Sequence, residues 1–230
     1  MKLLLVGHGK MGQLVATLAP QYGDEIAGVI DPMSPLHGGG PDAAQWSGAD
    51  VAIDFSTPDS VVNNAIVLAK RGISLVVGTT GWAAREPELR AVIADAGVGI
   101  VVAPNFSTGV VLFEALAAHA ARLFAPQAEF AAFLHEAHHS AKKDAPSGTA
   151  FSLKRAMEQA GFPRPIDVSS TRAGFIPGTH TIGFDGPAET ITLTHTARDR
   201  TAFARGALAA ARWVHGKRGW FTMRDVLGIT

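Results

Sequence analysis

Residues 3–12 read "LLLVGHGKMG", an apolar run followed by glycines at positions 7, 9 and 12. This GxGxxG spacing is typical of the turn between a strand and a helix that binds the pyrophosphate of a dinucleotide. Gly7 would make the tight turn, Gly9 would let the phosphates approach, and Gly12 would pack the helix against the strand. Asp31 ends the next apolar run, where a carboxylate can hold ribose hydroxyls. The segment predicts a dinucleotide-binding domain, and the alternative is a simple glycine-rich turn.

The first hundred residues alternate short apolar runs with helical segments. Continuous Val/Ile/Leu runs separated by helices indicate a parallel sheet covered on both faces. The predicted fold class is therefore α/β, with a Rossmann-like parallel-sheet nucleotide-binding domain. We expect strands at residues 3–6, 25–30, 51–55, 74–77 and 99–103, helices at 10–18, 59–71 and 85–95, and a loop over the Pro- and Gly-rich residues 31–50.

The pattern changes after about residue 107. Helices are expected at 109–123, near 149–160 and at about 202–214. The segments "HTIGF" (180–184) and "ETITLTHTA" (189–197) alternate β-branched residues as antiparallel strands do. We expect residues 1–107, rejoined by about 203–230, to form the dinucleotide-binding domain, and residues 108–202 to form a second, α+β domain with a mixed or antiparallel sheet.

The composition excludes several classes of function. The chain has 230 residues, 20 basic and 20 acidic, so no net charge favours nucleic acid or an anionic membrane. It has no cysteine, which excludes disulfides, thiolate nucleophiles and cysteine-ligated zinc. The N-terminal apolar run is too short for a signal peptide or a membrane anchor. A cytoplasmic enzyme or binding protein is expected.

Two further strand ends resemble cofactor-binding loops. "VVGTTG" and "VVAPNFS" follow the fourth and fifth predicted strands. In an open α/β sheet, ligands bind at the carboxyl ends of the strands. An ordinary polar turn is the alternative in each case. We expect the nicotinamide half of the cofactor to contact Gly78, Thr79, Thr80, Ala103, Pro104, Asn105 and Phe106.

Residues 135–150 read "HEAHHSAKKDAPSGTA" and admit two chemical interpretations. His135, Glu136 and His139 satisfy the HExxH pattern of zinc proteases. That pattern needs a helix, so that both histidines face one ion, and a further protein ligand. The preceding residues fit a helix or a buried strand equally well. The lysines at 142 and 143 would place positive charge beside the metal.

The second interpretation is proton transfer and anion binding. His138 titrates near neutrality and suits general acid/base catalysis, while Lys142 can bind an anionic substrate or donate a proton. Ser147 or Thr149 can cap the following helix, whose free N–H groups at Gly148 and Thr149 would bind a carboxylate. A solvated, charged loop with a helix cap is the bland alternative.

The segment 136–150 resembles the signature of the 4-hydroxy-tetrahydrodipicolinate reductase (dihydrodipicolinate reductase) family, E-x-H-H-x-x-K-x-D-A-P-S-G-T-A, at every fixed position. The similarity extends to the glycine segment, "VGTTG", "APNFS", "RAG" at 172–174 and "MRDVL" at 223–227. The resemblance implies NADH- or NADPH-dependent reduction of the cyclic imine dicarboxylate 4-hydroxy-tetrahydrodipicolinate/dihydrodipicolinate to tetrahydrodipicolinate, on the diaminopimelate route to lysine.

The resemblance also implies residue roles. His138 is the expected proton donor or acceptor and Lys142 a second proton donor, in a segment of strand and loop without a metal. The small-molecule dicarboxylate would bind to His139, Lys142, Gly148 and Thr149. The family implies a homotetramer built through the middle, substrate-binding and oligomerisation domain. The alternatives are a zinc hydrolase using HExxH at 135–139 and a non-catalytic NAD-binding relative.

The glycine segment bears on the choice of cofactor. Asp31 would repel the 2′-phosphate of NADP, and Pro32 lacks a backbone N–H to compensate. Many family members have arginine where this chain has Lys10 and Thr57. NADH is therefore the expected preferred cofactor, with NADPH second. The residues expected to bind its adenosine and pyrophosphate are Gly7, Gly9, Lys10, Met11, Gly12 and Asp31.

Overall fold

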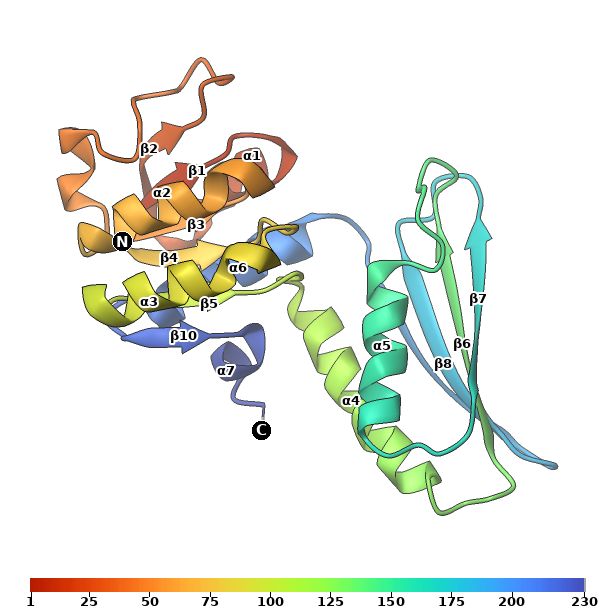
Figure 1. Cartoon of the computed structure of the whole chain (residues 1–230). Helices are drawn as coiled ribbons and strands as arrows, with labels where there is room; N and C mark the ends of the chain where they lie inside the picture. The colour runs from red at the N-terminus through yellow and green to blue at the C-terminus, as the bar shows by residue number, and fades with distance from the viewer. Residues whose placement is uncertain (230) are drawn as a thin grey trace. The chain divides into compact units, whose positions relative to one another are not determined.

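The fold is known from a computed structural model, which describes residues 1–229 (Figure 1). The chain divides into two compact units. The first combines Met1–Thr108 with Arg200–Thr230, and the second is Gly109–Asp199. Among residues 1–229, no helix is both long and apolar enough to cross a membrane.

The first unit is built on a six-stranded sheet in which every pair of neighbours is parallel. Its strand order is β10-β5-β4-β3-β1-β2. The inner strands are buried on both faces, which explains their uninterrupted Val, Ile and Leu runs. The strands are β1 (Lys2–Val6), β2 (Glu25–Ile30), β3 (Val51–Asp54), β4 (Ser74–Val77), β5 (Gly99–Val102) and β10 (Gly219–Phe221).

Helices cover both faces of this sheet. The helices α2 (Pro58–Lys70) and α3 (Glu86–Ala96) pack together on one face, while α1 (Lys10–Leu18) and α6 (Thr201–Val214) pack together on the other. Gly206 lets α6 approach the loop after β5 closely, since a Cβ at this position would lie 1.7 Å from the carbonyl oxygen of Phe106. Short 3-10 turns at Ala19–Tyr22, Ala44–Gly48 and Ala83–Arg85, and helix α7 (Met223–Leu227), complete the unit.

The second unit has a four-stranded mixed sheet of order β7-β6-β8-β9. The strands are β6 (Ala131–His138), β7 (Ile166–Arg172), β8 (Thr179–Asp185) and β9 (Thr190–Thr196), and only β6 and β7 are parallel. Helices α4 (Thr108–Phe124) and α5 (Gly148–Gln159) pack on one face, where their apolar side chains form a core with those of β6 and β8 (Figure 1).

The sequence predictions agree with the α/β class and with most elements, but two strands were not foreseen. The region of β6 fits a helix or a strand by pattern alone, the family resemblance implied a strand and loop, and the structure makes it a strand. The exposed strand β7 and the three-residue edge strand β10 lacked a clear apolar pattern and were missed. The predicted loop at 31–50 is correct apart from its 3-10 turn.

Candidate active site

The glycine turn of the first unit has the geometry that a bound pyrophosphate needs. Gly7 has φ of +88°, and a Cβ there would lie 2.5 Å from the carbonyl oxygen of Phe55. A Cβ at Gly12 would lie 2.1 Å from the carbonyl oxygen of Gly7, so the helix and the turn touch directly. At Gly9, which caps α1, a Cβ would meet nothing within 4 Å. The N-terminus of α1 is therefore open to an anion.

Asp31 lies beside this turn. Its carboxylate accepts hydrogen bonds from the backbone N–H of His8 (2.7 Å) and of Met33 (2.9 Å). These bonds, the one from His8 first, lower the pKa of Asp31. The carboxylate is therefore ionised and fixed against the glycine turn. One lone pair on each oxygen is left to receive a ribose hydroxyl.

A cavity of about 460 Å³ continues from the glycine turn along the carboxyl ends of the strands. Six of its lining residues were expected from the sequence: Gly9, Lys10, Met11, Gly78, Thr79 and Thr80. Three were missed, namely Phe55, Ser56 and Pro58, which follow β3. The signal for these three was available, because β3 ends at the same sheet edge as β4.

The loop after β5 does not line this cavity. Ala103 and Phe106 are buried, and Phe106 packs edge-on against Phe55 with ring centroids 6.0 Å apart. The side-chain oxygen of Asn105 accepts the backbone N–H of Ser107. Phe106 thus supports the wall that Phe55 forms, and cofactor binding by Ala103, Pro104, Asn105 and Phe106 stays a prediction.

Buried Asp54 shapes the same wall. Its Oδ1 accepts hydrogen bonds from Ser56 and, at 2.7 Å, from the hydroxyl of Thr79. Burial raises the pKa of Asp54 against the effect of these bonds. The carboxyl group therefore ties the ends of β3 and β4 together, and it holds Ser56 and Thr79, two of the hydroxyl-bearing residues that line the cavity.

In the second unit, the HExxH residues lie on strand β6 and the turn after it, which decides whether they can bind one metal ion. Side chains alternate along a strand, so His135 and Glu136 point to opposite faces, and His135 bonds the hydroxyl of Ser169 at 2.9 Å. Along an extended chain, His135 and His139 are about 13 Å apart, too far to share an ion. The zinc-hydrolase interpretation of residues 135–139 is wrong, because it requires a helix.

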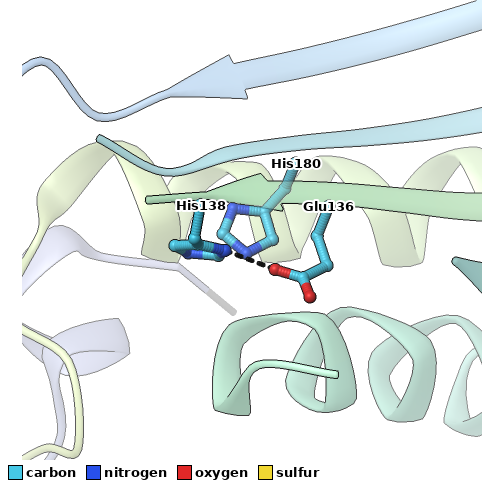
Figure 2. A group of neighbouring side chains, drawn as sticks. All are labelled: Glu136, His138 and His180. Atoms are coloured by element: carbon cyan, nitrogen blue, oxygen red, sulfur yellow. Dashed lines mark ion pairs between the residues drawn. The ribbon is translucent and has the colours of Figure 1, made fainter. Parts of the chain in front are cut away.

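The structure instead brings together the side chains of Glu136, His138 and His180 (Figure 2). Glu136 stands directly opposite His180 on β8, and His138 follows two residues along the same face of β6. Nδ1 of His138 contacts Oε2 of Glu136. The His180 ring packs edge-on against the His138 ring, with centroids 5.1 Å apart. Nε2 of His180 bonds the Ser147 hydroxyl at 3.1 Å.

Arg172 completes the charge balance of the cluster. Its guanidinium donates to Oε1 of Glu136 at 2.7 Å and to the backbone carbonyl of Asp144. Burial alone would raise the pKa of Glu136, but hydrogen bonds from Arg172 and Ser170 and the positive charges nearby bring it to about 2. Glu136 is thus a fully buried carboxylate that is ionised at neutral pH.

The two histidines are neutral at neutral pH. Burial, aided by the charges of Lys142 and Arg172, lowers the pKa of His138, although Glu136 acts in the opposite direction. Burial and the neighbouring His138 lower the pKa of His180 to about 4. His138 is only 11% exposed, yet it is the histidine of this pair that can reach solvent.

The ligand atoms of Glu136, His138 and His180 lie within 4.8 Å of one another, the arrangement of a possible metal site. The local charges oppose a dication there. Arg172 is bonded to the same carboxylate, and the charge of Lys142 acts on both histidines. Proton transfer uses the cluster without adding charge to it.

The following turn carries the remaining predicted residues. Lys142 forms an ion pair with Asp144 at 2.7 Å, and His139 follows directly after β6. Ser147 caps α5 by accepting the N–H of Ala150, so Ser147 rather than Thr149 is the cap. Gly148 and Thr149 form the first turn of α5. A cation and a helix start therefore lie in one short segment, as anion binding requires.

The fold and these groups define a class: oxidoreductases that use a nicotinamide dinucleotide. The comparisons with known proteins give the family. The family model described as dihydrodipicolinate reductase, N-terminus, matches residues 1–106, and the one for its C-terminus matches residues 109–227. The chain belongs to the dihydrodipicolinate reductase family, whose members are NAD(P)H-dependent enzymes.

Individual relatives agree along the whole chain. The 4-hydroxy-tetrahydrodipicolinate reductase of Myxococcus xanthus is 45% identical over 97% of this chain and 85% of its own length. That of Methanoregula boonei is 37% identical over 99% and 98%. A dipicolinate-bound dihydrodipicolinate reductase from Paenisporosarcina sp. TG-14 has the same fold, with a TM-score of 0.81, 23% identity and 98% of each chain covered.

Proposed function

We propose that the chain reduces 4-hydroxy-tetrahydrodipicolinate to tetrahydrodipicolinate with NAD(P)H, on the diaminopimelate route to lysine. The observation that carries the proposal is His138, held by a buried carboxylate directly before a cationic turn and a helix start. A steady-state assay with the cyclic imine and each nicotinamide cofactor tests it. Absence of cofactor oxidation with both would end the proposal, and it would favour a non-catalytic relative.

The predicted residues of the second unit take distinct parts in this reaction. The bound dinucleotide supplies a hydride to the substrate ring. His138 exchanges the proton that completes the reduction, and Lys142 is a second proton donor. His139, Lys142, Gly148 and Thr149 bind the two carboxylates of the substrate. The second unit, 109–199, is thus the substrate-binding domain, and a biosynthetic reaction of this kind fits a cytoplasmic location.

Substrate binding has to compete with an internal carboxylate. Asp144 holds the ammonium group of Lys142 and also accepts a hydrogen bond from the N–H of Gly148, which together lower the pKa of Asp144. Two of the proposed donors to the substrate therefore bind an acid already. A substrate carboxylate would take the place of the Asp144 side chain, which is more than half exposed and free to turn to solvent.

Asp31 makes NADH the proposed preferred cofactor. Its fixed, ionised carboxylate can accept the 2′-hydroxyl of NADH but repels the 2′-phosphate of NADPH. We expect a lower KM and a higher kcat/KM with NADH in one buffer. Asp31→Ala should reduce this preference about 10- to 100-fold, the value of a charge-assisted hydrogen bond. Steady-state kinetics with both cofactors measures it.

The control is Asp95→Ala, which removes an exposed carboxylate from α3. It should leave the ratio of the two kcat/KM values unchanged. Asp31 also holds the glycine turn through His8, so its loss should weaken both cofactors somewhat and NADH more. A wild-type preference for NADPH would show that Lys10, which lines the cavity, outweighs Asp31.

We further propose a homotetramer assembled through the second unit. Strand β9 lies at one edge of the sheet, and most of its side chains are exposed. Threonines pair across the face opposite the helices, Thr179 with Thr196 and Thr181 with Thr194. An exposed edge and an uncovered face of this kind need protection from uncontrolled pairing. Sedimentation should show a tetramer, and a monomer alone at micromolar concentration would contradict the proposal.

A further inference from the structure

Glu136 is a fully buried charged group of the second unit. Its side chain is 0% exposed, and each carboxylate oxygen forms an ion pair with a neighbouring side chain. Arg172 on the neighbouring strand β7 binds Oε1, while Oε2 contacts the His138 ring two residues away on β6. The hydroxyl of Ser170, directly opposite on β7, adds a further hydrogen bond. A buried carboxylate with this many partners has one fixed orientation.

The contact decides which nitrogen of His138 carries a proton. A neutral imidazole has one N–H group and one lone pair, and the partner of one nitrogen fixes the state of the other. An ionised carboxylate can only accept hydrogen bonds. Because Glu136 is ionised, Nδ1 of His138 must be the protonated nitrogen, and Nε2 must carry the lone pair.

The surroundings of Nε2 fit a reactive atom. The backbone of Gly178 lies beside this atom; φ there is +131°, and a Cβ at this position would lie 3.2 Å from Nε2 and from Cδ2 of His138. A glycine can adopt this conformation and adds no side chain, so the space beside Nε2 stays free. The structure thus closes Nδ1 with Glu136 and leaves Nε2 accessible.

We propose that Glu136 is a positioning residue that holds His138 in the Nδ1–H tautomer and presents Nε2 as the atom that exchanges the proton with the substrate. The inference rests on the proposed function and assigns an atom to its proton step. Glu136 acts through His138 and does not touch the substrate.

The proton step then balances as follows. Imidazolium His138, whose two N–H groups face Glu136 and the substrate, breaks its Nε2–H bond. Hydride addition leaves an enamine-like ring. The electron pair of this enamine forms the new bond to the proton. His138 returns to the neutral Nδ1–H form, and solvent reprotonates Nε2 for the next cycle. The negative charge of Glu136 stabilises the imidazolium form throughout.

Four charged or titratable groups face His138 and must be counted in its pH dependence. Glu136 is on its own strand, Arg172 on β7, His180 on β8, and Lys142 is in the following turn. Glu136 raises the pKa of His138, while Arg172 and Lys142 lower it. Removing the charge of Glu136 should therefore move the pKa of His138 downward.

The first experiment reads the tautomer directly, by ¹⁵N chemical shifts of the histidine side chains in the unliganded wild-type protein. The signal that is lost in His138→Gln identifies His138. We expect it to show protonated Nδ1 and unprotonated Nε2 near neutral pH. A predominantly Nε2–H form would overturn the proposal whether or not the protein has activity, so its failure is distinct from failure of the proposed function.

The second experiment compares Glu136→Gln with Asp167→Asn, an exposed acid-to-amide change on β7. We expect Glu136→Gln to lower kcat roughly 10- to 100-fold, the usual cost of losing a group that orients an imidazole through its other nitrogen. KM should change little. Activity requires protonated His138 and is lost as pH rises through its pKa, so this decline should begin at lower pH in Glu136→Gln. Asp167→Asn should match wild type.

Glu136→Asp separates positioning from folding. It keeps the charge and the partner Arg172 but shortens the reach to His138. If Glu136 were purely structural, Glu136→Asp would restore both the kcat and the thermal stability that Glu136→Gln loses. A positioning carboxylate would regain stability while the ¹⁵N shifts still report mixed tautomers and kcat stays low. Equal kcat and an unshifted pH profile in Glu136→Gln would also overturn the proposal.

Discussion

Replacing His138 with glutamine is expected to lower kcat by roughly 10²–10⁴, the usual range for loss of a general acid or base. Glutamine keeps a polar group beside Glu136, but its amide does not gain and lose a proton as an imidazole does. The substrate carboxylates bind to other residues, so KM should change only modestly. Steady-state kinetics with the cyclic imine and saturating cofactor measures both parameters.

His135→Gln is the matched control, because His135 belongs to the same strand and points to the opposite face. It should retain the wild-type kcat. Circular dichroism of both variants would verify that β6 and its sheet are intact. Wild-type kcat/KM in His138→Gln would show that another group carries the proton.

Lys142→Ala should damage both kcat and KM, because Lys142 is proposed to bind a carboxylate and to donate a proton. A charge-assisted hydrogen bond contributes about 1.5–3 kcal/mol, so KM should rise roughly 10- to 100-fold. The loss of a proton donor should lower kcat by about 10² or more. The measurement is again steady-state kinetics, extended to substrate concentrations high enough to saturate the variant.

Lys143→Ala removes the adjacent, exposed ammonium group and controls for the general electrostatic attraction of the turn. It should change KM slightly and kcat not at all. The variant at 142 also frees the Asp144 carboxylate from its cation. If Lys142→Ala altered KM alone, its assigned role in protonation would be wrong and only the binding role would stand.

Sequence patterns were sufficient for most of the first unit, apart from the edge strand β10, because its signals are local. A buried parallel strand is recognised by an unbroken apolar run, and the glycine turn by the spacing of three glycines. The residues after β1 and β4 could therefore be predicted to line the cavity. Phe55, Ser56 and Pro58 carry no motif of their own and were missed, although β3 ends at the same sheet edge as β4.

The histidine cluster could be predicted only in part, because it depends on strand pairing. Glu136 and His138 stand in one motif, but His180 and Arg172 join them through the register of β6 with β8 and β7. Strand β7 is mostly exposed and has no clear apolar alternation, so its register could not be inferred. The charge balance of Glu136 thus required the structure.

The interleaved order of the two units has a consequence for biosynthesis on the ribosome. Helix α6 packs on β3, β4 and β5, and β10 extends the sheet beyond β5, yet both elements come after the second unit in the chain. The second unit is continuous and can acquire its native structure as soon as it has emerged. Until α6 is made, β3, β4 and β5 lack its cover on one face, and exposed apolar strands of this kind make a nascent chain depend on chaperones.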